Sequence, residues 1–169
     1  MSNVDVIYGP RELKLAILER VDNINFERLV FPTLGLSITH PWRGVGSAIF
    51  LELGPLKRVP RIRVPGHDLK GLATVMIEWG WRVERPRSIE VGSWSTDRKI
   101  DVGIRRLKRL KVESIKVEGR LPELTIGLSD GRWLRTFMIS DSQPSWVLFL
   151  PDGSWLHVER GMVIREDGA

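Results

Sequence analysis

The side chains best suited to acid–base or metal chemistry are the three histidines, His40, His67 and His157. Only His157 has a suitable neighbour, because Glu159 follows two residues later and would lie on the same face of a strand. A facial-triad metal site needs another histidine, and in the usual order it comes later in the chain, where none is present. His67 lies in a segment rich in Pro and Gly without metal-ligand spacing. The sequence therefore predicts no metal, no other cofactor, and a surface histidine beside a carboxylate at position 157.

Other enzyme signatures are weak. A Ser-His-Asp set can be assembled from almost any chain of this size, so nucleophilic hydrolysis has little support. No Gly-x-x-x-x-Gly-Lys-Ser/Thr phosphate loop is present, and Gly44-Val45-Gly46 precedes an expected strand rather than a helix. Glu84 and Glu159 could act as paired carboxylates, but an arginine directly follows each, so local ion pairing explains them equally well. We predict no catalytic residues, which argues against an enzyme and leaves only carboxylate or histidine chemistry open.

The basic residues gather in the middle of the chain. The 169 residues carry a net charge of +5, and positions 42–111 alone hold sixteen Lys or Arg and seven Asp or Glu. The densest stretch predicts a polyanion-binding site, with phosphates as the expected ligand groups. Its cations are Arg105, Arg106, Lys108, Arg109 and Lys111. The alternative is that these cations form a solvated face, or that they pair after folding with acids of the flanking thirds, positions 1–41 and 112–169.

Seven tryptophans are many for this length. If the chain is extended at Trp79-Gly80-Trp81, the two indole rings share one face of a strand, close to Arg82 and Arg85. Aromatic rings beside cations are typical of surfaces that stack single-stranded nucleic acid, so Trp79 and Trp81 join the predicted polyanion site. The other interpretation, which we favour for most of the tryptophans, is that they fill the core of a small β protein.

Composition places the chain among globular proteins. Hydrophobic residues make up 42% and charged residues 28%, and the absence of cysteine excludes disulfides, iron–sulfur clusters and thiolate zinc sites. The longest apolar runs, 72–77 and 146–150, are far shorter than the roughly 18–20 residues of a membrane span. The first 20 residues lack the pattern of a secretory signal. We therefore expect a cytoplasmic protein without membrane contact.

The pattern of elements predicts an α+β fold dominated by antiparallel sheet. Helical spacing favours a helix over 10–21, and Asn25 could cap a short turn over 26–30. Alternating apolar segments separated by Gly, Pro and Asp then predict the strands 34–39, 47–53, 73–79, 80–84, 88–94, 112–118, 123–128, 132–139, 146–150 and 154–159. Asp-Gly pairs at 130–131 and 152–153 predict tight hairpins within a meander over 120–160. The basic stretch is expected to form a short helix that enters a strand.

One offset of 75 residues relates two pairs of segments. It aligns Val83-Glu84-Arg85 with Val158-Glu159-Arg160, and the alternating strand at 49–53 with that at 124–128. We interpret this as an internal duplication. A single consolidated domain over 1–169 would then hold two similar packed β-meander units. Its predicted parts are an N-terminal helical segment 1–33, β unit one 34–95 with the duplicated part at 44–95, a linker 96–116 and β unit two 117–167. Chance similarity between short β runs is the alternative.

Four motifs lie along the chain: Trp-Arg-Gly-Val-Gly-Ser-Ala-Ile-Phe-Leu-Glu-Leu-Gly at 42–54, Glu-Trp-Gly-Trp-Arg at 78–82, Leu-Ser-Asp-Gly-Arg-Trp-Leu at 128–134 and Ser-Trp-Val-Leu-Phe-Leu at 145–150. With these motifs the chain resembles a family of small uncharacterised bacterial β-rich proteins with a duplicated β unit. The likeness covers about 13–165, and it departs at Leu53, where the family tends to have Phe. The family has no established activity, so the resemblance implies no catalytic residues. A looser likeness to duplicated β domains of bacterial toxin-immunity proteins implies action by binding.

Two function classes follow from these observations. The leading hypothesis is a bacterial, cytoplasmic, non-enzymatic protein-binding domain, immunity-like in its mode of action, whose partner is another protein. The alternative is a nucleic-acid-binding module that uses the basic segment 105–111. An exposed strand edge would in addition allow a homodimer by sheet extension.

Overall fold

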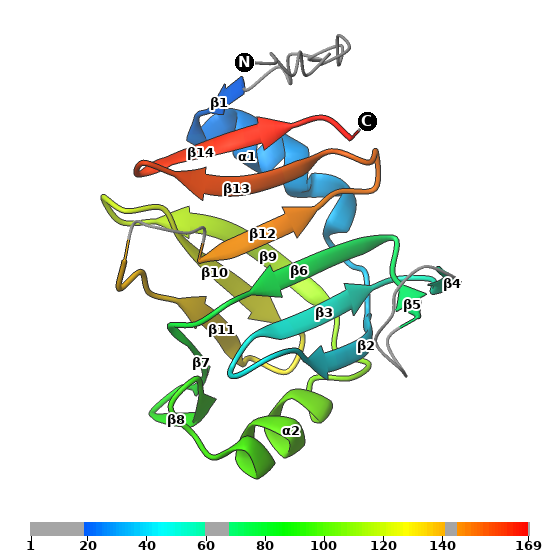
Figure 1. Ribbon diagram of the computed structural model, residues 1–169, viewed down its shortest axis with the longest axis vertical. Helices are drawn as coiled ribbons and strands as arrows, with labels where there is room; N and C mark the ends of the chain where they lie inside the picture. The colour runs from blue at the N-terminus through cyan, green and yellow to red at the C-terminus, as the bar shows by residue number, and fades with distance from the viewer. Residues whose placement is uncertain (1–18, 60–67, 141–144, 169) are drawn as a thin grey trace, which may run out of the picture.

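The computed structural model describes residues 19–59, 68–140 and 145–168, which form two antiparallel sheets, a small two-stranded ribbon and two α-helices (Figure 1). The seven-stranded sheet has the order β1-β14-β13-β12-β6-β3-β2. In chain order its strands are β1 (Glu19–Val21), β2 (Ile38–Arg43), β3 (Ile49–Leu53), β6 (Ala73–Ile77), β12 (Trp146–Phe149), β13 (Trp155–Glu159) and β14 (Met162–Glu166). No helix in the described ranges is long and apolar enough to cross a membrane.

The second sheet has five strands in the order β8-β7-β11-β10-β9. They are β7 (Trp81–Arg85), β8 (Ser88–Gly92), β9 (Val112–Glu118), β10 (Glu123–Leu128) and β11 (Trp133–Thr136). β4 (Lys57–Arg58) pairs with β5 (Leu69–Lys70) as a separate ribbon. The expectation of a β-rich fold dominated by antiparallel pairing is confirmed.

The core lies between the two sheets. Figure 1 shows β9, β10 and β11 behind β12, β6 and β3, and alternate side chains of these strands form one buried apolar cluster. Trp81 and Trp146 are fully buried in it. The Trp146 indole N–H donates to the Pro122 carbonyl at 2.9 Å, and that of Trp81 donates to the Ser47 carbonyl at 2.7 Å. These two rings thus bury large apolar areas without losing a hydrogen bond, as the core interpretation of the tryptophans requires.

The first helix, α1 (Asn23–Val30), continues into the 3-10 turn η1 (Phe31–Thr33). Asp22, rather than Asn25, caps it: the Asp22 carboxylate accepts from the Asn25 backbone N–H at 2.8 Å. Its buried residues are Phe26 and Val30, and the Phe26 ring meets the Trp146 ring edge-on at 6.3 Å between centroids. Helix α1 thereby packs against the core.

The second helix, α2 (Asp97–Arg105), buries Ile100, Gly103 and Ile104. Gly103 permits a close approach to β8, because a Cβ atom at this position would lie 2.6 Å from Val91 Cγ1. Figure 1 shows α2 beside β8 at the end of the molecule opposite the C-terminus. The close approach therefore fixes the distance between α2 and β8.

The structure corrects four sequence expectations. Residues 19–21, the end of the helix expected over 10–21, form β1 instead, and the rest of that helix lies outside the described residues. The short helix expected over the basic stretch 105–111 lies earlier in the chain, because α2 ends at Arg105 and residues 106–109 form a turn. The expected meander over 120–160 is divided, since β10 and β11 join one sheet while β12 and β13 join the other. β14 was not expected, because the charged residues at its end interrupt the alternation of apolar and polar residues that indicates a strand.

Both hairpins predicted from Asp-Gly pairs are confirmed. β10 pairs with β11 around Gly131, and β12 pairs with β13 around Gly153. The φ angles of the two glycines are +80° and +89°, a region that favours glycine over residues with a Cβ atom.

The segments that follow the two helices contact each other reciprocally. The Gly35 N–H donates to the Val112 carbonyl at 2.7 Å and the Arg109 N–H to the Ile38 carbonyl at 2.8 Å. Likewise, the Ile38 N–H donates to Leu110 and the Val112 N–H donates to Leu36. Both β2 and β9 then pair with their next strand through a register shift. The two helix-to-strand segments therefore have corresponding hydrogen bonds.

Candidate functional site

A groove runs between β8 and α2. It consists of two adjoining hollows of about 490 and 390 Å³ that share Glu90 and Arg106. Val91, Val102 and Gly103 form part of its lining, while the ends carry charged groups. Its cations come from β7, α2, the α2 C-cap and the turn before β11: Arg85, Arg98, Lys99, Arg106 and Arg132. We call this the cationic groove.

Glu90 organises the cations of the groove. Its carboxylate, with 7% of the side chain exposed, accepts from Arg132 Nη1 at 3.0 Å, Arg85 Nε at 3.2 Å and Arg106 Nη1 at 3.4 Å. Burial by itself would raise the pKa of Glu90, but the hydrogen bonds and charges of Arg85 and Arg132 outweigh it and hold the pKa below its ordinary value. Glu90 is therefore ionised at neutral pH and holds three guanidinium groups around one point.

The three arginines differ in how many donors they leave for a ligand. Arg132 uses all three guanidinium nitrogens, on Asp130 at 2.7 Å, on Glu90 and on the Arg106 carbonyl at 3.0 Å. Arg85 and Arg106 each place a single guanidinium nitrogen on Glu90 and are 54% and 60% exposed. Arg132 thus positions the cluster, whereas Arg85 and Arg106 each have guanidinium N–H groups without a partner among the described residues, and these groups can donate to an anion.

The structure brings only one residue of the predicted basic segment into the groove itself. Arg106 is the C-cap of α2, and the other four cations lie within five residues of it along the chain but do not line the groove. They are exposed, and within the described parts of the chain they form no ion pair: Arg105, Lys108, Arg109 and Lys111. Arg106 pairs with Glu90, an acid of the same middle third 42–111, so among the described residues none of the five cations pairs with an acid of the flanking thirds.

The predicted stacking pair Trp79 and Trp81 does not share a face. Trp81 is buried, while Trp79 is 41% exposed, because Gly80 at φ +69° interrupts the extended backbone between them. Trp94, which the sequence analysis did not single out, is 87% exposed and lies three residues before α2. Its flanking serines, polar neighbours unlike the apolar strands around the core tryptophans, were the available signal.

Trp79 and Trp94 line a common hollow near the start of α2. It measures about 280 Å³ and is also lined by Ser47, Gly80, Ser93 and Ile139. Ile139 is 62% exposed. We call this the aromatic hollow. It adjoins the cationic groove through the short stretch from Trp94 to Thr96, since Thr96 lines the groove.

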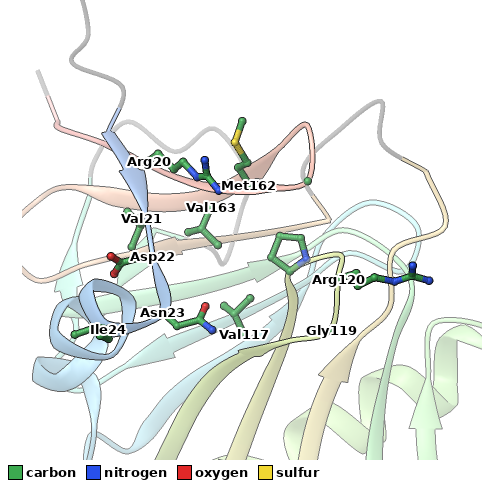
Figure 2. Close-up of a pocket in the computed structure, with 12 residues that line it drawn as sticks. Arg20, Val21, Asp22, Asn23, Ile24, Val117, Gly119, Arg120, Met162 and Val163 are labelled. Carbon is green, nitrogen blue, oxygen red and sulfur yellow. The ribbon is translucent and has the colours of Figure 1, made fainter.

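A further hollow, of about 750 Å³, lies between β1, the start of α1 and the turns that follow β9 and β13 (Figure 2). Figure 2 shows Val117 and Val163 facing one another, with Arg120 extending away from Arg20. Asp22 is engaged as the helix cap. The charged groups of this hollow therefore do not converge on a point where a ligand would meet them together.

The candidate catalytic groups lie apart from the cationic groove. His157 Nε2 lies 2.7 Å from Glu166 of the neighbouring strand, while Glu159, the expected partner, is exposed. Glu84 pairs with Arg82. No cluster of three or more His, Asp or Glu suited to a metal occurs among the described residues. The histidine therefore pairs across strands rather than along its own.

A serine motif also lies beside the groove. Gly127-Leu128-Ser129-Asp130-Gly131 has the Gly-x-Ser-x-Gly pattern of hydrolase nucleophile elbows, which the sequence analysis missed. It forms the turn of the β10–β11 hairpin instead of a strand-to-helix turn. Ser129 Oγ accepts from the Lys111 backbone N–H at 3.0 Å. Ser129 therefore connects the basic segment to this hairpin and lacks the setting of a nucleophile.

The outer face of the seven-stranded sheet is a second surface of note. Residues that lie opposite one another on neighbouring strands place half-buried apolar side chains in two rows across this face. The rings of Trp42 and Phe50 stack with their centroids 3.9 Å apart. The members are Trp42, Phe50, Met76, Val147, Phe149 and Trp155. In Figure 1 this face is turned to the viewer and neither α1 nor α2 covers it. We call it the open face.

Comparison of the chain with protein-family models, with curated proteins and with solved structures gives no match in any of the three. The resemblance to small bacterial β-rich proteins stays a prediction. Function is therefore inferred from geometry and charge.

Proposed function

We propose that this protein binds nucleic acid through the cationic groove and the basic segment that continues from it. The observation that supports this proposal is the continuity of exposed cations from Arg98 and Lys99, past Arg85 and Arg106, to Lys111. The two carboxylates among the groove residues, Glu90 and Asp130, are both engaged by arginines.

Phosphodiesters are the chemistry that fits this surface. Guanidinium groups with free N–H donors bind phosphate oxygens in a planar, bidentate manner, and each neutralised phosphate releases condensed counterions. Exposed lysines such as Lys108 add point charges without directional demands. The groove therefore suits contacts to a nucleic-acid backbone rather than the reading of base sequence in a duplex.

A salt-dependent titration tests the proposal. Fluorescently labelled single-stranded DNA, RNA and duplex DNA are titrated at about 50 and 200 mM salt, over which a protein with several phosphate contacts loses affinity steeply. The test variant replaces Arg105, Arg106, Lys108, Arg109 and Lys111 by Gln. A matched control removes five exposed cations from other surfaces: Arg20, Arg28, Lys116, Arg120 and Arg160.

We expect the first variant to lose binding and the control to keep most of it. Each lost phosphate contact should lower the slope of log affinity against log salt by about 0.7–0.9. Equal losses in both variants would instead indicate a nonspecific effect of net charge and would contradict a site at the groove. Absence of binding at low salt would contradict nucleic-acid binding altogether.

The second candidate function is binding of another protein without catalysis, in the cytoplasm, as the sequence hypothesis has it. Support comes from the open face, because aromatic residues and Met with few charges are typical of interface centres. A Val147→Glu substitution at its middle should remove a co-purifying partner while leaving the fold intact. The same face or a free strand edge would accommodate a homodimer, which sedimentation measures directly.

We further propose that the chain arose by internal duplication. Support comes from the corresponding hydrogen bonds at Gly35, Ile38, Arg109 and Val112 and from the matching register shifts of β2–β3 and β9–β10. The later strands do not occupy the places that the 75-residue offset predicts. The offset relates β7 to β13, but β7 lies directly beside β11 in the five-stranded sheet, whereas β12 separates β13 from β6 in the seven-stranded sheet. Separate expression of 19–95 and 96–168 tests whether the halves associate on mixing.

A further inference from the structure

We infer that the nucleic acid bound by this protein is single-stranded, with an unpaired base seated in the aromatic hollow and the adjoining phosphates in the cationic groove. The inference rests on the proposed nucleic-acid function and specifies its ligand class. It is carried by the position of the aromatic hollow at one end of the groove.

The aromatic hollow has the composition of a base-binding site. Trp79 and Trp94 expose indole surface at its wall, and Ile139 adds an apolar side chain. At about 280 Å³ the hollow has room for a planar base. An indole that is 87% exposed, as that of Trp94 is, offers a stacking face that every base can use, whatever its sequence.

The backbone around the hollow is held in place, so the site is formed before a ligand arrives. The Ser47 carbonyl accepts from the buried Trp81 indole, and the Ser93 backbone N–H donates to the Trp81 carbonyl at 2.9 Å. The Phe137 N–H donates to Gly80 at 2.6 Å, which ties the strand before Ile139 to the Trp79 turn. The backbone that carries these side chains therefore needs little ordering when a base enters.

The spacing of the two sites suits a single strand. Trp94 lies before the first turn of α2, and Arg106 caps its last turn, so nine helical residues or about 13 Å of helix separate them. That distance corresponds to a short run of extended nucleotides. A duplex could touch the cations with its phosphates, but its paired bases could not reach Trp79 or Trp94 without being extruded.

Four probes of equal phosphate number separate base contacts from phosphate contacts: oligothymidylate, an abasic strand of the same length, a blunt duplex and inorganic polyphosphate. Each is titrated against the full-length wild type and Trp94→Ala. Phe31→Ala is the matched control, because Phe31 is 70% exposed and lies at the end of α1, away from the groove.

We expect Trp94→Ala to weaken oligothymidylate binding by about five- to 150-fold, the range for losing one stacked base, and to leave the abasic strand and polyphosphate unchanged. Trp79→Ala should act in the same direction. Phe31→Ala should change nothing. Quenching of tryptophan emission by oligothymidylate should be smaller in Trp94→Ala than in the wild type.

Equal binding of the thymidylate, abasic and duplex probes to the wild type, with no effect of Trp94→Ala, would overturn the single-strand inference and leave phosphate binding by the groove in place. Loss of all binding in the five-glutamine variant would then still support the proposed function. If no probe binds the wild type at low salt, the proposed function and the inference both fail. The two failures are therefore distinguishable.

Discussion

Helices α1 and α2 occupy corresponding places but present opposite surfaces. Each packs on the strand that follows the other helix, α1 on β9 and α2 on β2. Counted from their caps, Phe26 corresponds to Ile100 and Val30 to Ile104, all buried. The two helices therefore share the apolar stripe that attaches them to the core.

The exposed positions of the two helices differ. Ile24 and Phe31 are 82% and 70% exposed on the α1 side, and their counterparts on the α2 side are Arg98 and Arg105. The charged residues lining a small hollow beside α1 are Glu27, Lys116 and Glu118, whereas those lining the groove beside α2 are four arginines, one lysine and two carboxylates. Buried positions thus set the architecture, and exposed ones set what each end of the molecule can bind.

The largest effect should come from the shared buried stripe. Replacing Ile104 by Ala leaves a cavity where the side chain is only 2% exposed, and the free energy of unfolding should fall by about 2–5 kcal/mol. Val30→Ala, at the corresponding position, should cost less because fewer methyl groups are lost. Chemical denaturation monitored by tryptophan emission measures both. A negligible effect at Ile104 would contradict the correspondence of the two stripes.

The α2 end of the molecule differs from the α1 end by the cluster of arginines around Glu90. Glu90→Gln should lower the free energy of unfolding by about 1–3 kcal/mol, mainly through the largely buried contact with Arg132. Because the pKa of Glu90 is lowered on folding, its stabilisation is present above the ordinary value of 4.5 and is lost as pH falls through the folded pKa. Wild-type stability should therefore fall more steeply below pH 4.5 than that of the variant. Parallel pH profiles would show that this cluster does not stabilise the fold.

Gly103 gives the groove its width. A methyl group placed there meets Val91, so Gly103→Ala should cost about 1–3 kcal/mol by pushing α2 from β8. Nucleic-acid affinity should change in the same variant, since Arg98 and Arg106 move with the helix. The control is Val102→Ala, which trims the groove lining without a clash. Unchanged stability in Gly103→Ala would show that the helix relaxes freely.

The smallest effect concerns the turn after each helix. Gly35 has φ +80° and Arg109, its counterpart, has φ +75°, a conformation that disfavours residues with a Cβ atom. Arg109→Gly should raise the free energy of unfolding by about 0.5–1 kcal/mol, and Gly35→Ala should lower it by a similar amount. Thermal melting of the two variants gives the comparison. If the free energy of unfolding changed in the same direction in both variants, the correspondence between Gly35 and Arg109 would be refuted.

Local patterns in the sequence were sufficient for the hairpins and for most strands. Asp-Gly pairs fix the turns at Gly131 and Gly153 because the required positive φ is a property of the residue itself. The exposed, largely unpaired basic segment was also predictable, since consecutive cations have no room to be buried together. The Glu90 cluster was not predictable, because Arg106 and Arg132 come from elements far from Glu90 in the chain. Trp94 had a local signal in its flanking serines, but that signal does not place the residue beside Trp79.

The sequence by itself determined the β-rich class, the turn positions and the existence of a basic surface, because alternation, turn chemistry and charge density act over a few neighbouring residues. Only the tertiary structure decided that β10–β11 and β12–β13 enter different sheets, and that Arg85, Arg106 and Arg132 meet at Glu90. It also decided which tryptophans are buried. These outcomes depend on packing between segments distant in sequence, where many pairings satisfy the same local pattern and the shared core selects one.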